Sequence, residues 1–417
     1  MEENLQVMAD YSPLRPGLPV SRARQWFEES GLRGKTLDAT LKHIAGNAGN
    51  FTDALPSLEG ARDHGPGGAY ADKFELVPGR AVPRAQLIGD NHPTNSGTSP
   101  RYDVADAPLV YAVTDATHNG YGSITLDLYR GAHTHVGAAR EAGLSVAAQE
   151  HVATAFATEA LGALRAYVQT GERPTPYVTS KELKGAAFRQ LLVDAEKADS
   201  NAKVKSLTGS KSGTSFKKNI RIPKHAASRA ATEQAFQDQY LAKLPEPLRS
   251  RVKLLDVGTE VNIGGSNSGL PHFYALARFG DTTRVVELKQ LIPSPVEFTK
   301  GTPSLADAER TVATAALIQA SPNDLQQPMV LGDKQYVAVP YDDRAREIDL
   351  KLLDTEKKLV HMAKNNGRLT GRVLAQTVDP QALAVWMGAM EDTEAVHALR
   401  DYAMTYDRQA QRDASGF

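Results

Sequence analysis

The pattern of apolar and polar positions predicts a strand-rich region between residues 251 and 341 and helices over much of the remaining chain. Apolar runs at 251–257, 273–277, 284–290 and 335–340 predict four strands. After Ser145, a typical helix N-cap residue, apolar residues recur at helical spacing and predict a helix that ends before Gly171: Val152, Phe156, Leu161, Leu164 and Val168. Helices are also predicted at 348–362, 383–390 and from 395 to the end. The fold class predicted by this pattern is α+β.

Five segments follow from the same pattern. Residues 1–85 contain two short predicted helices, one at 36–45, among loops rich in Gly and Asp. Residues 86–200 and 342–417 are expected to form one helical lobe, and residues 251–341 a smaller β-rich lobe. Residues 201–250 are expected to be a basic linker followed by a helix.

The stretch from 86 to 97 carries the first candidate chemistry. A short apolar strand is predicted to end at Gly89 and to deliver Asp90 and Asn95 into a loop. Protein kinases use this Asp-x-x-x-x-Asn spacing in the catalytic loop, where the Asp takes the hydroxyl proton and the Asn binds magnesium. Asp90 is therefore the candidate base and Asn95 a candidate metal ligand. The lone His92 is expected to brace the loop, since such a histidine is more often structural than catalytic.

A second carboxylate, Asp115, supports this interpretation. A strand pair is predicted at 102–104 and 109–113, and it leads into Asp115, where a kinase-like enzyme places its second metal-binding carboxylate. Mg²⁺ prefers oxygen ligands, so Asn95 and Asp115 beside bound phosphates could hold it. Asp127 is expected to fix the loop by accepting backbone hydrogen bonds, because a buried carboxylate must find donors.

A glycine-rich turn and a lysine occur much later in the chain. The candidate phosphate-covering residues are Gly264, Gly265, Ser266 and Gly269, between the first two strands of the β-rich lobe. Such glycines let backbone N–H groups approach phosphates, and Lys289 on the third strand can neutralise them. This order of strand, glycine turn, strand and lysine-bearing strand is that of a kinase ATP-binding lobe. A glycine-rich hairpin is more often structural, and Leu270 excludes a Walker P-loop.

A helix is predicted to begin at Ser304, with Asp307 three residues on as a capping box. Kinases place a Glu on this helix to hold the lysine. Glu309 is the candidate, and an exposed helical Glu without that role is the alternative. The predicted strand at 335–340 leads out of the lobe, where a hinge would meet adenine.

Composition narrows the possible functions. With 417 residues, 41% hydrophobic and 23% charged, the chain has room for two or three domains and the character of a globular protein. The absence of cysteine excludes disulfides, thiolate zinc sites and cysteine nucleophiles. A net charge of -1 gives no global attraction to nucleic acid or to anionic membranes, so neither is an expected partner. No signal peptide or membrane-spanning run is recognisable, so a cytoplasmic location is expected, with a secreted effector as the open alternative.

Residues 203–229 are basic and contain no acidic residue. We expect a solvated linker between the lobes, because Gly- and Ser-containing loops are usually that. A phosphate-docking segment or a nucleic-acid patch is the alternative. Phe216 is the segment's single aromatic residue, so base stacking has little support.

Several of these stretches resemble the bacterial domain-of-unknown-function 2252 (DUF2252) family. Residues 89–97 resemble its G-D-x-H-x-x-N-x-G motif, and 126–130 resemble W-D-L-x-R. Residues 286–294 resemble L-Q-x-K-E-A-x-P-S, and 401–413 resemble its closing F-A-x-x-Y-A-D-Q-x-x-R-D. The resemblance implies a kinase-like fold, and the first motif is also similar to the aminoglycoside and choline phosphotransferase loop. Thr117 departs from the pattern, because the family usually has a further acid there.

The order of the parts differs from that of ordinary kinases, in which the glycine loop and lysine come first. Here Asp90, Asn95 and Asp115 precede Lys289. One site can form only if the chain is circularly permuted, with its terminal helices returning to the N-terminal region. The prediction is therefore a two-lobed, kinase-like, permuted α+β fold.

Three functions follow as alternatives. The first is a phosphotransferase that uses ATP and Mg²⁺, with a protein or small-molecule acceptor that the sequence does not identify. The second is a metallophosphoesterase, because His133-Thr-His135 could bind a metal from a strand. The third is a non-catalytic kinase-like protein that binds a nucleotide or a partner, as Thr117 and the irregular glycine turn suggest.

Overall fold

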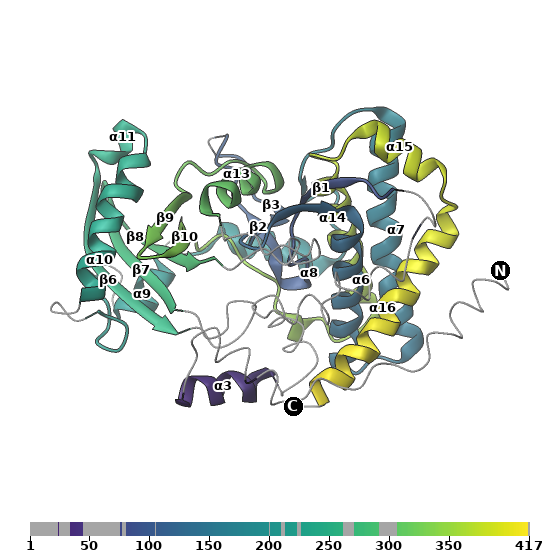
Figure 1. The fold of residues 1–417 in the computed structure, drawn as a ribbon, viewed down its shortest axis with the longest axis horizontal. Helices are drawn as coiled ribbons and strands as arrows, with labels where there is room; N and C mark the ends of the chain where they lie inside the picture. Colours follow the sequence, from purple (N-terminus) through teal and green to yellow (C-terminus); the bar gives the residue numbers. More distant parts are fainter. Residues whose placement is uncertain are drawn as a thin grey trace.

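The structure is a computed structural model that describes residues 34–44, 81–104, 106–199, 201–209, 213–222, 227–261, 271–291 and 307–415, together with residues 24 and 76. Figure 1 shows a large antiparallel sheet at one end of the molecule and long helices at the other, with short strands between them. The fold is a mixed α+β fold, as the sequence predicted.

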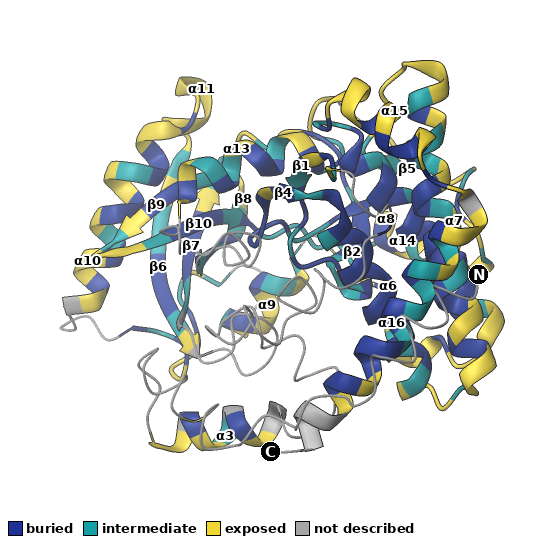
Figure 2. Cartoon of the chain, turned by 45° about the vertical axis from the view of Figure 1, so that its right-hand side comes forward, coloured by how far each residue is buried: buried dark blue, intermediate teal, exposed yellow. Residues whose placement is uncertain are grey.

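The long helices form the larger core. They are α6 (Ile124–Glu141), α7 (Val146–Thr170), α14 (Glu356–Leu374), α15 (Pro380–Gly388) and α16 (Asp392–Ser415), with α8 (Ala186–Glu196) and the short η5 (Leu350–Leu352) beside them. Ser145 caps α7 by accepting a hydrogen bond from the Ala148 N–H, and Gly171 ends it with a φ of 70°, as predicted. Buried positions concentrate where these helices face one another (Figure 2).

Two glycines let α14 lie against α7. A Cβ at Gly367 would lie 2.3 Å from the Phe156 carbonyl oxygen, and one at Gly371 would lie 2.3 Å from that of Ala160. Only glycine permits backbones to approach so closely. The C-terminal segment therefore packs onto the first half of the chain.

The terminal helix α16 packs onto α6 through stacked rings. Tyr402 stacks on Tyr129 with ring centroids 4.1 Å apart, and Tyr406 meets His133 edge-on at 4.5 Å. Asp407 accepts a hydrogen bond from Arg140 at 3.0 Å. The closing motif at 401–413, which had no predicted role, thus holds the helix that follows the candidate catalytic loop.

Short strands connect this core to the candidate site. Strand β1 (Arg84–Leu87) pairs antiparallel with β4 (Gly120–Ser123), and β2 (Ser96–Ser99), β3 (Val110–Val113) and β5 (Tyr177–Val178) form a second antiparallel sheet. The expected strand at 102–104 is instead a bend, and β3 pairs with β2. Strand β2 consists of Ser, Gly and Thr, so it lacks the apolar signal on which the prediction depended.

The large sheet has the strand order β6-β7-β8-β10-β9 and is antiparallel throughout. Its strands are β6 (Val252–Val261), β7 (Pro271–Phe279), β8 (Thr282–Gln290), β9 (Gln327–Leu331) and β10 (Lys334–Pro340). Helix α13 (Ala308–Ile318) lies between β8 and β9 in the chain. Asp307 is its N-cap and accepts from the Arg310 N–H, whereas the predicted start at Ser304 lies outside the described residues.

The described part of residues 203–229 packs on the sheet and does not form the expected solvated linker, whereas the helix expected later in residues 201–250 is present. Residues 201–250 contain α9 (Ala202–Thr208), α10 (Ala227–Ala235), the π-helical η4 (Phe236–Leu241) and α11 (Glu246–Arg249). Phe236 and Tyr240 join one apolar cluster with sheet residues, while Phe216 and Ile220 join another. Apolar residues at 204, 207, 216 and 220 explain this difference, because burying them outweighs exposing the intervening lysines.

The buried Asp256 neutralises part of that basic segment. It accepts hydrogen bonds from Arg229 at 2.8 Å and from the Phe216 N–H at 2.9 Å, and Arg221 lies 3.2 Å away. These arginines therefore have an internal acidic partner.

Two further observations complete the fold. Helix α3 (Gly34–Ile44) matches the helix expected at 36–45, and its Leu37 and Leu41 belong to the main core. Among the described helices, none is both long enough and apolar enough to span a bilayer.

Candidate active site

Asp90 lies buried directly after β1 and faces three basic side chains. It is 2% exposed, and its Oδ1 accepts a hydrogen bond from Arg130 Nη2 at 2.6 Å. Its Oδ2 lies 3.5 Å from His92 Nε2 and 3.9 Å from His118 Nδ1. Each Asp90 oxygen therefore has its own surroundings: Oδ1 is tied to the guanidinium, and Oδ2 faces the imidazoles at longer distances.

These neighbours determine the protonation of the cluster. Burial alone would raise the pKa of Asp90, but His92 and Arg130 outweigh it and hold the pKa well below the usual range. Burial lowers the pKa of His118, although Asp90 and Asp115 oppose that shift. Asp90 is therefore ionised at neutral pH.

Asp127 anchors the loop by the backbone hydrogen bonds that the sequence predicted. Its two oxygens accept from the Ile88 N–H at 2.7 Å and from the Gly89 N–H at 3.0 Å. Burial raises the pKa of Asp127 to about 6 in spite of these donors. Gly89 has a φ of 82°, and a Cβ there would lie 2.0 Å from the His118 carbonyl oxygen. The glycine of the Gly-Asp pair is thus required by both conformation and space.

Asn95 closes the same loop. Its Nδ2 donates to the Asp90 carbonyl oxygen at 2.7 Å, and its N–H donates to the His92 carbonyl oxygen at 3.0 Å. His92 Nδ1 lies 3.0 Å from the Thr94 hydroxyl, consistent with the bracing role predicted for it. Because the amide nitrogen is used within the loop, the amide oxygen is the atom that Asn95 can offer to a cation.

Asp115 and Lys289 form a direct ion pair between the two parts of the molecule. Lys289 Nζ on β8 donates to Asp115 Oδ2 at 2.9 Å, across 174 positions of sequence. The Asp115 Oδ1 accepts from the N–H and the hydroxyl of Thr117, at 2.9 and 2.7 Å. Asp115 and Lys289 were expected to belong to different lobes but to share one site, and in the structure they lie in contact.

Contact between Asp115 and Lys289 shifts the pKa of each group so that its ionised form is favoured. Burial would raise the pKa of Asp115, but Lys289 outweighs it and holds the pKa well below the usual range. Burial would lower the pKa of Lys289, but Asp115 raises it above the usual range. Both groups are charged at neutral pH.

Two further carboxylates line the cavity beside this pair, Glu287 and Glu347. Glu287 lies two residues before Lys289 on β8 and is 3.2 Å from Lys203 Nζ, which also sits over the Tyr341 ring. Burial raises the pKa of Glu347, while His92 opposes the shift. Three carboxylates, those of Asp115, Glu287 and Glu347, thus line the cavity near Lys289.

Glycine at position 97 brings the segment of Glu347 to the site. Gly97 forms an isolated antiparallel bridge with Glu347, and the Thr98 N–H donates to the Arg346 carbonyl oxygen at 2.8 Å. A Cβ at Gly97 would lie only 2.2 Å from that oxygen. The last glycine of the first motif therefore permits a contact between β2 and residues 344–347.

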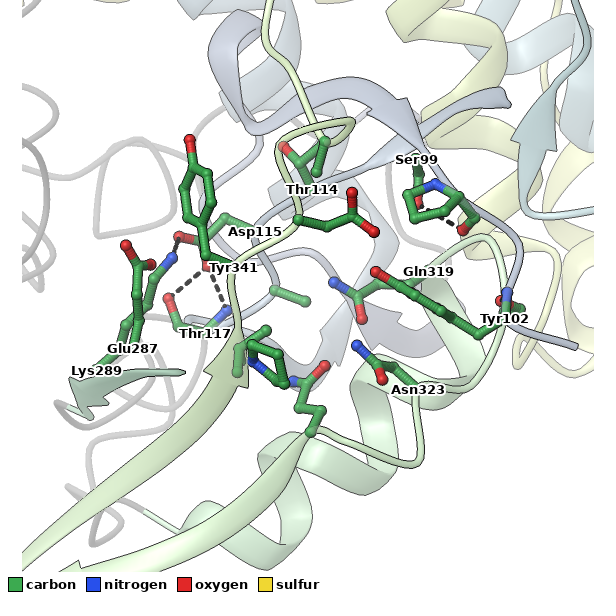
Figure 3. Close-up of a pocket in the computed structure, with 18 of the residues that line it drawn as sticks. Ser99, Tyr102, Thr114, Asp115, Thr117, Glu287, Lys289, Gln319, Asn323 and Tyr341 are labelled. Carbon is green, nitrogen blue, oxygen red and sulfur yellow. Dashed lines mark hydrogen bonds and ion pairs between the residues drawn. The ribbon is translucent and has the colours of Figure 1, made fainter. Parts of the chain in front are cut away.

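The cavity itself has a volume of about 490 Å³. Figure 3 shows Asp115, Lys289 and Thr117 at one end and Gln319, Asn323 and Tyr102 at the other. The end of β10 and the following Tyr341 form part of the wall between them. Asp90 is not among the lining residues.

The structure does not bring Glu309 to Lys289. Glu309 binds Lys243 at 2.5 Å, and its side chain is 75% exposed. Asp115 takes the position against the lysine that was expected for Glu309, whose side chain lies on the exposed face of α13. Gly264, Gly265, Ser266 and Gly269 lie outside the described residues, between β6 and β7 in the chain.

The His-x-His pair lies on α6 and not on the expected strand. Residues two apart on a helix do not face each other, so His133 and His135 do not form one metal site. His133 packs on Tyr406, and His135 Nδ1 lies 2.7 Å from the Gly131 carbonyl oxygen. Burial lowers both pKa values, that of His135 to about 4.

The sequence analysis did not predict four residues that shape the site: His118, Arg130, Glu287 and Glu347. Arg130 stood in the quoted 126–130 stretch, and its position three residues after Asp127 on a helix was a usable signal. Glu287 could have been found from Lys289, since residues two apart on a strand share a face. Glu347 had no local signal, because its approach depends on the long-range contact with Gly97.

The geometry defines an α+β protein in which a helical region and an antiparallel sheet meet at a cavity containing an Asp–Lys ion pair. A family model described as "Uncharacterized protein conserved in bacteria (DUF2252)" matches residues 71–417, and the chain belongs to this family. No curated protein and no solved structure matched significantly.

Proposed function

We propose that the protein is a kinase-like phosphotransferase that uses ATP and Mg²⁺. The observation that carries the proposal is the 2.9 Å contact between Lys289 Nζ and Asp115 Oδ2 at the charged end of the cavity. A lysine that contacts phosphates and a carboxylate that contacts their metal are the two charges that phosphoryl transfer requires side by side.

The order of elements in the sheet supports the same function. Lys289 lies on the third strand of the sheet, a helix follows that strand in the chain, and two more strands complete it. Kinases carry their phosphate-binding lysine on the third strand of the ATP-binding lobe, after the glycine-rich connection. The phosphate-covering role expected of Gly264 and Gly269, in the connection between β6 and β7, stays a prediction because these residues lie outside the described ranges. The catalytic loop precedes that lobe in the chain, so the kinase-like fold is permuted.

The donor set fits magnesium that arrives with a nucleotide. Within the described ranges, no group of three or more His, Asp or Glu side chains could bind a metal by itself. Mg²⁺ is usually held by one or two protein ligands together with substrate phosphates and water. Asp115 and the Asn95 amide oxygen would hold it here, and it would neutralise charge on the transferring phosphoryl group.

The remaining steps, which are phosphate binding and orientation of the acceptor hydroxyl, are assigned to side chains of the protein. Lys289 binds phosphate oxygens, and Thr117 keeps the Asp115 carboxylate oriented by two hydrogen bonds. Arg130 holds Asp90 Oδ1, so Oδ2 is the oxygen that can accept a hydrogen bond from the acceptor hydroxyl. Because the pKa of Asp90 is held well below its usual range, Asp90 is a weak base. It therefore orients the acceptor hydroxyl before phosphoryl transfer and takes up the proton only late in that transfer.

A non-catalytic nucleotide-binding protein is the second candidate. Thr117 favours it, because a hydroxyl stands beside Asp115 where a further carboxylate could bind metal. This candidate shares the Lys289–Asp115 site and differs only in the absence of transfer. Metallophosphoesterase activity loses its support, since His133 and His135 lie on different sides of a helix.

The test is incubation with γ-labelled ATP and Mg²⁺ against a bacterial lysate and a metabolite pool. Wild type should transfer label to an acceptor, and Asp90→Ala should lower the transfer rate by about 10³-fold or more, because it loses the orienting base. Asp106→Ala, an acidic residue between β2 and β3, is the matched control and should retain wild-type transfer. ATP binding by wild type without any labelled acceptor would favour the non-catalytic candidate.

A further inference from the structure

The end of the cavity opposite Lys289 is lined by neutral amides. Gln319, Asn323 and Gln326 come from the connection between α13 and β9, and Tyr102 lies beside them. In Figure 3 the Gln319 and Asn323 side chains face each other across this end, away from Lys289. The cavity therefore has the Asp115–Lys289 ion pair at one end and three amides at the other, where Asp342 lies within hydrogen-bond reach of Tyr102.

Gln326 is the most buried of the three amides. It is 8% exposed, and its side chain makes no hydrogen bond with any other residue in the part of the chain that is described. The Gln319 side-chain amide likewise has no such partner among the described residues. Neither amide is fully enclosed, so both are open to the cavity, and a ligand that hydrogen-bonds to them would replace water there. Thr114 Oγ1, also in the cavity wall, is buried and has no partner within the described ranges.

The backbone at the end of β10 offers little to a ligand. Pro340 has no N–H, and the Tyr341 N–H donates to the Val285 carbonyl oxygen at 2.8 Å. Hydrogen-bond donors for a flat polar ligand must therefore come from side chains. The Tyr102 ring, in the cavity wall beside the amides, supplies an apolar face, whereas the Tyr341 ring lies at the Lys289 end under Lys203 Nζ.

We propose that this end of the cavity, lined by Gln319, Asn323 and Gln326, binds the base of a nucleoside triphosphate whose phosphates lie at Lys289. This inference rests on the proposed function and adds the base-recognition residues to it. The volume of about 490 Å³ lies within the range of roughly 300–1,000 Å³ typical of small-molecule sites. A carboxamide can present its donor and acceptor in either order, so Gln326 accepts adenine and guanine alike.

The experiment compares the affinities of ATP, GTP and inorganic tripolyphosphate, each with Mg²⁺, by titration calorimetry. Wild type should bind both nucleotides more tightly than tripolyphosphate, with ATP and GTP within about tenfold of each other. Gln326→Leu should lower the affinity for ATP by about tenfold or more and leave the affinity for tripolyphosphate unchanged, because only the base loses a hydrogen-bond partner. Gln327→Leu is the control, since that amide donates to the Asp324 carbonyl oxygen at 2.7 Å and lies outside the cavity wall.

A charge variant tests recognition separately from folding. Gln326→Glu offers acceptors only, so it should shift the ATP-to-GTP affinity ratio toward GTP, whose base edge carries two adjacent donors. Retained tripolyphosphate binding shows that each variant is folded. The inference is overturned if wild type binds tripolyphosphate as tightly as ATP, or if Gln326→Leu binds ATP as tightly as wild type does. It is also overturned if Gln326→Leu lowers the affinities for ATP and for tripolyphosphate equally. If wild type binds neither the nucleotides nor tripolyphosphate, the proposed function is overturned together with this inference.

Discussion

At the scale of single residues, the site is a set of charges with assigned partners, of which Asp90, Arg130 and Asp127 are buried and Asp115 and Lys289 half-buried. Asp90 has Arg130, Asp115 has Lys289, and Asp127 has two backbone N–H groups. Breaking a buried ion pair from one side typically costs about 3–5 kcal/mol, because the remaining charge stays desolvated. Substitutions at these positions are therefore informative only when folding is measured beside ligand binding.

Asp127 gives a pH-dependent prediction. A carboxyl whose pKa is about 6 in the folded chain, against 3.8 in the unfolded chain, costs stability once it is ionised in both. The cost is absent below about pH 4, grows as the pH rises through the window between the two values, and is complete above about pH 6. Relative to Asp127→Asn, wild type should therefore gain up to about 3 kcal/mol of unfolding free energy as the pH falls from 7 to 4.

The measurement is denaturant unfolding of both proteins across that pH range. The difference between them cancels the other titrating groups, including Asp90 and Asp115, whose lowered pKa values destabilise both proteins equally in acid. A stability difference that stays constant with pH, or that moves against wild type in acid, contradicts the burial that we assign to Asp127.

At the scale of elements, the contact between β2 and residues 344–347 positions one side of the cavity. The Thr98 hydroxyl donates to the Arg344 carbonyl oxygen at 2.5 Å and accepts from the Arg346 N–H at 2.9 Å. Together with the bridge at Gly97, these bonds fix the segment that follows β10 against the strand that follows Asn95. The two parts of the molecule are thus joined by backbone pairing as well as by Lys289 and Asp115.

Gly97→Ala tests this contact. The added Cβ would meet the Arg346 carbonyl at 2.2 Å, so the segment must move, at a cost of about 1–3 kcal/mol of unfolding free energy. Affinity for Mg²⁺–ATP should fall as well, because Arg346 and Glu347 line the cavity. Gly162→Ala on α7 is the control: a Cβ there meets nothing within 4 Å, and the helix should gain about 0.5–1 kcal/mol. Equal behaviour of the two variants would show that the close approach at Gly97 does not exist.

At the scale of the whole molecule, the sequence predicted most of the architecture. The strands β6, β7, β8 and β10 and the helix α7 were visible because their apolar periodicity is strong and their lengths are ordinary. Strand β2 was not predicted, because its Ser, Gly and Thr residues give no apolar alternation. The packing of residues 201–222 on the sheet was not predicted either, because their apolar residues are scattered and show no regular period. Within the site, the structure brings Asp115 and Lys289 into contact, whereas Glu309 lies on the exposed face of α13 and pairs with Lys243.

The central claim is that Asp115 and Lys289 together bind nucleotide phosphates. The most direct measurement is the affinity for Mg²⁺–ATP of wild type, Lys289→Met, Asp115→Asn and the double variant, with folding checked by circular dichroism. Lys253→Met and Asp281→Asn, exposed residues on β6 and in the β7–β8 turn, are matched controls. We predict a loss of at least about tenfold in each single variant, from the removal of one charge-assisted contact, and wild-type affinity in both controls. Folded Lys289→Met and Asp115→Asn proteins that bind Mg²⁺–ATP as tightly as wild type would contradict the account.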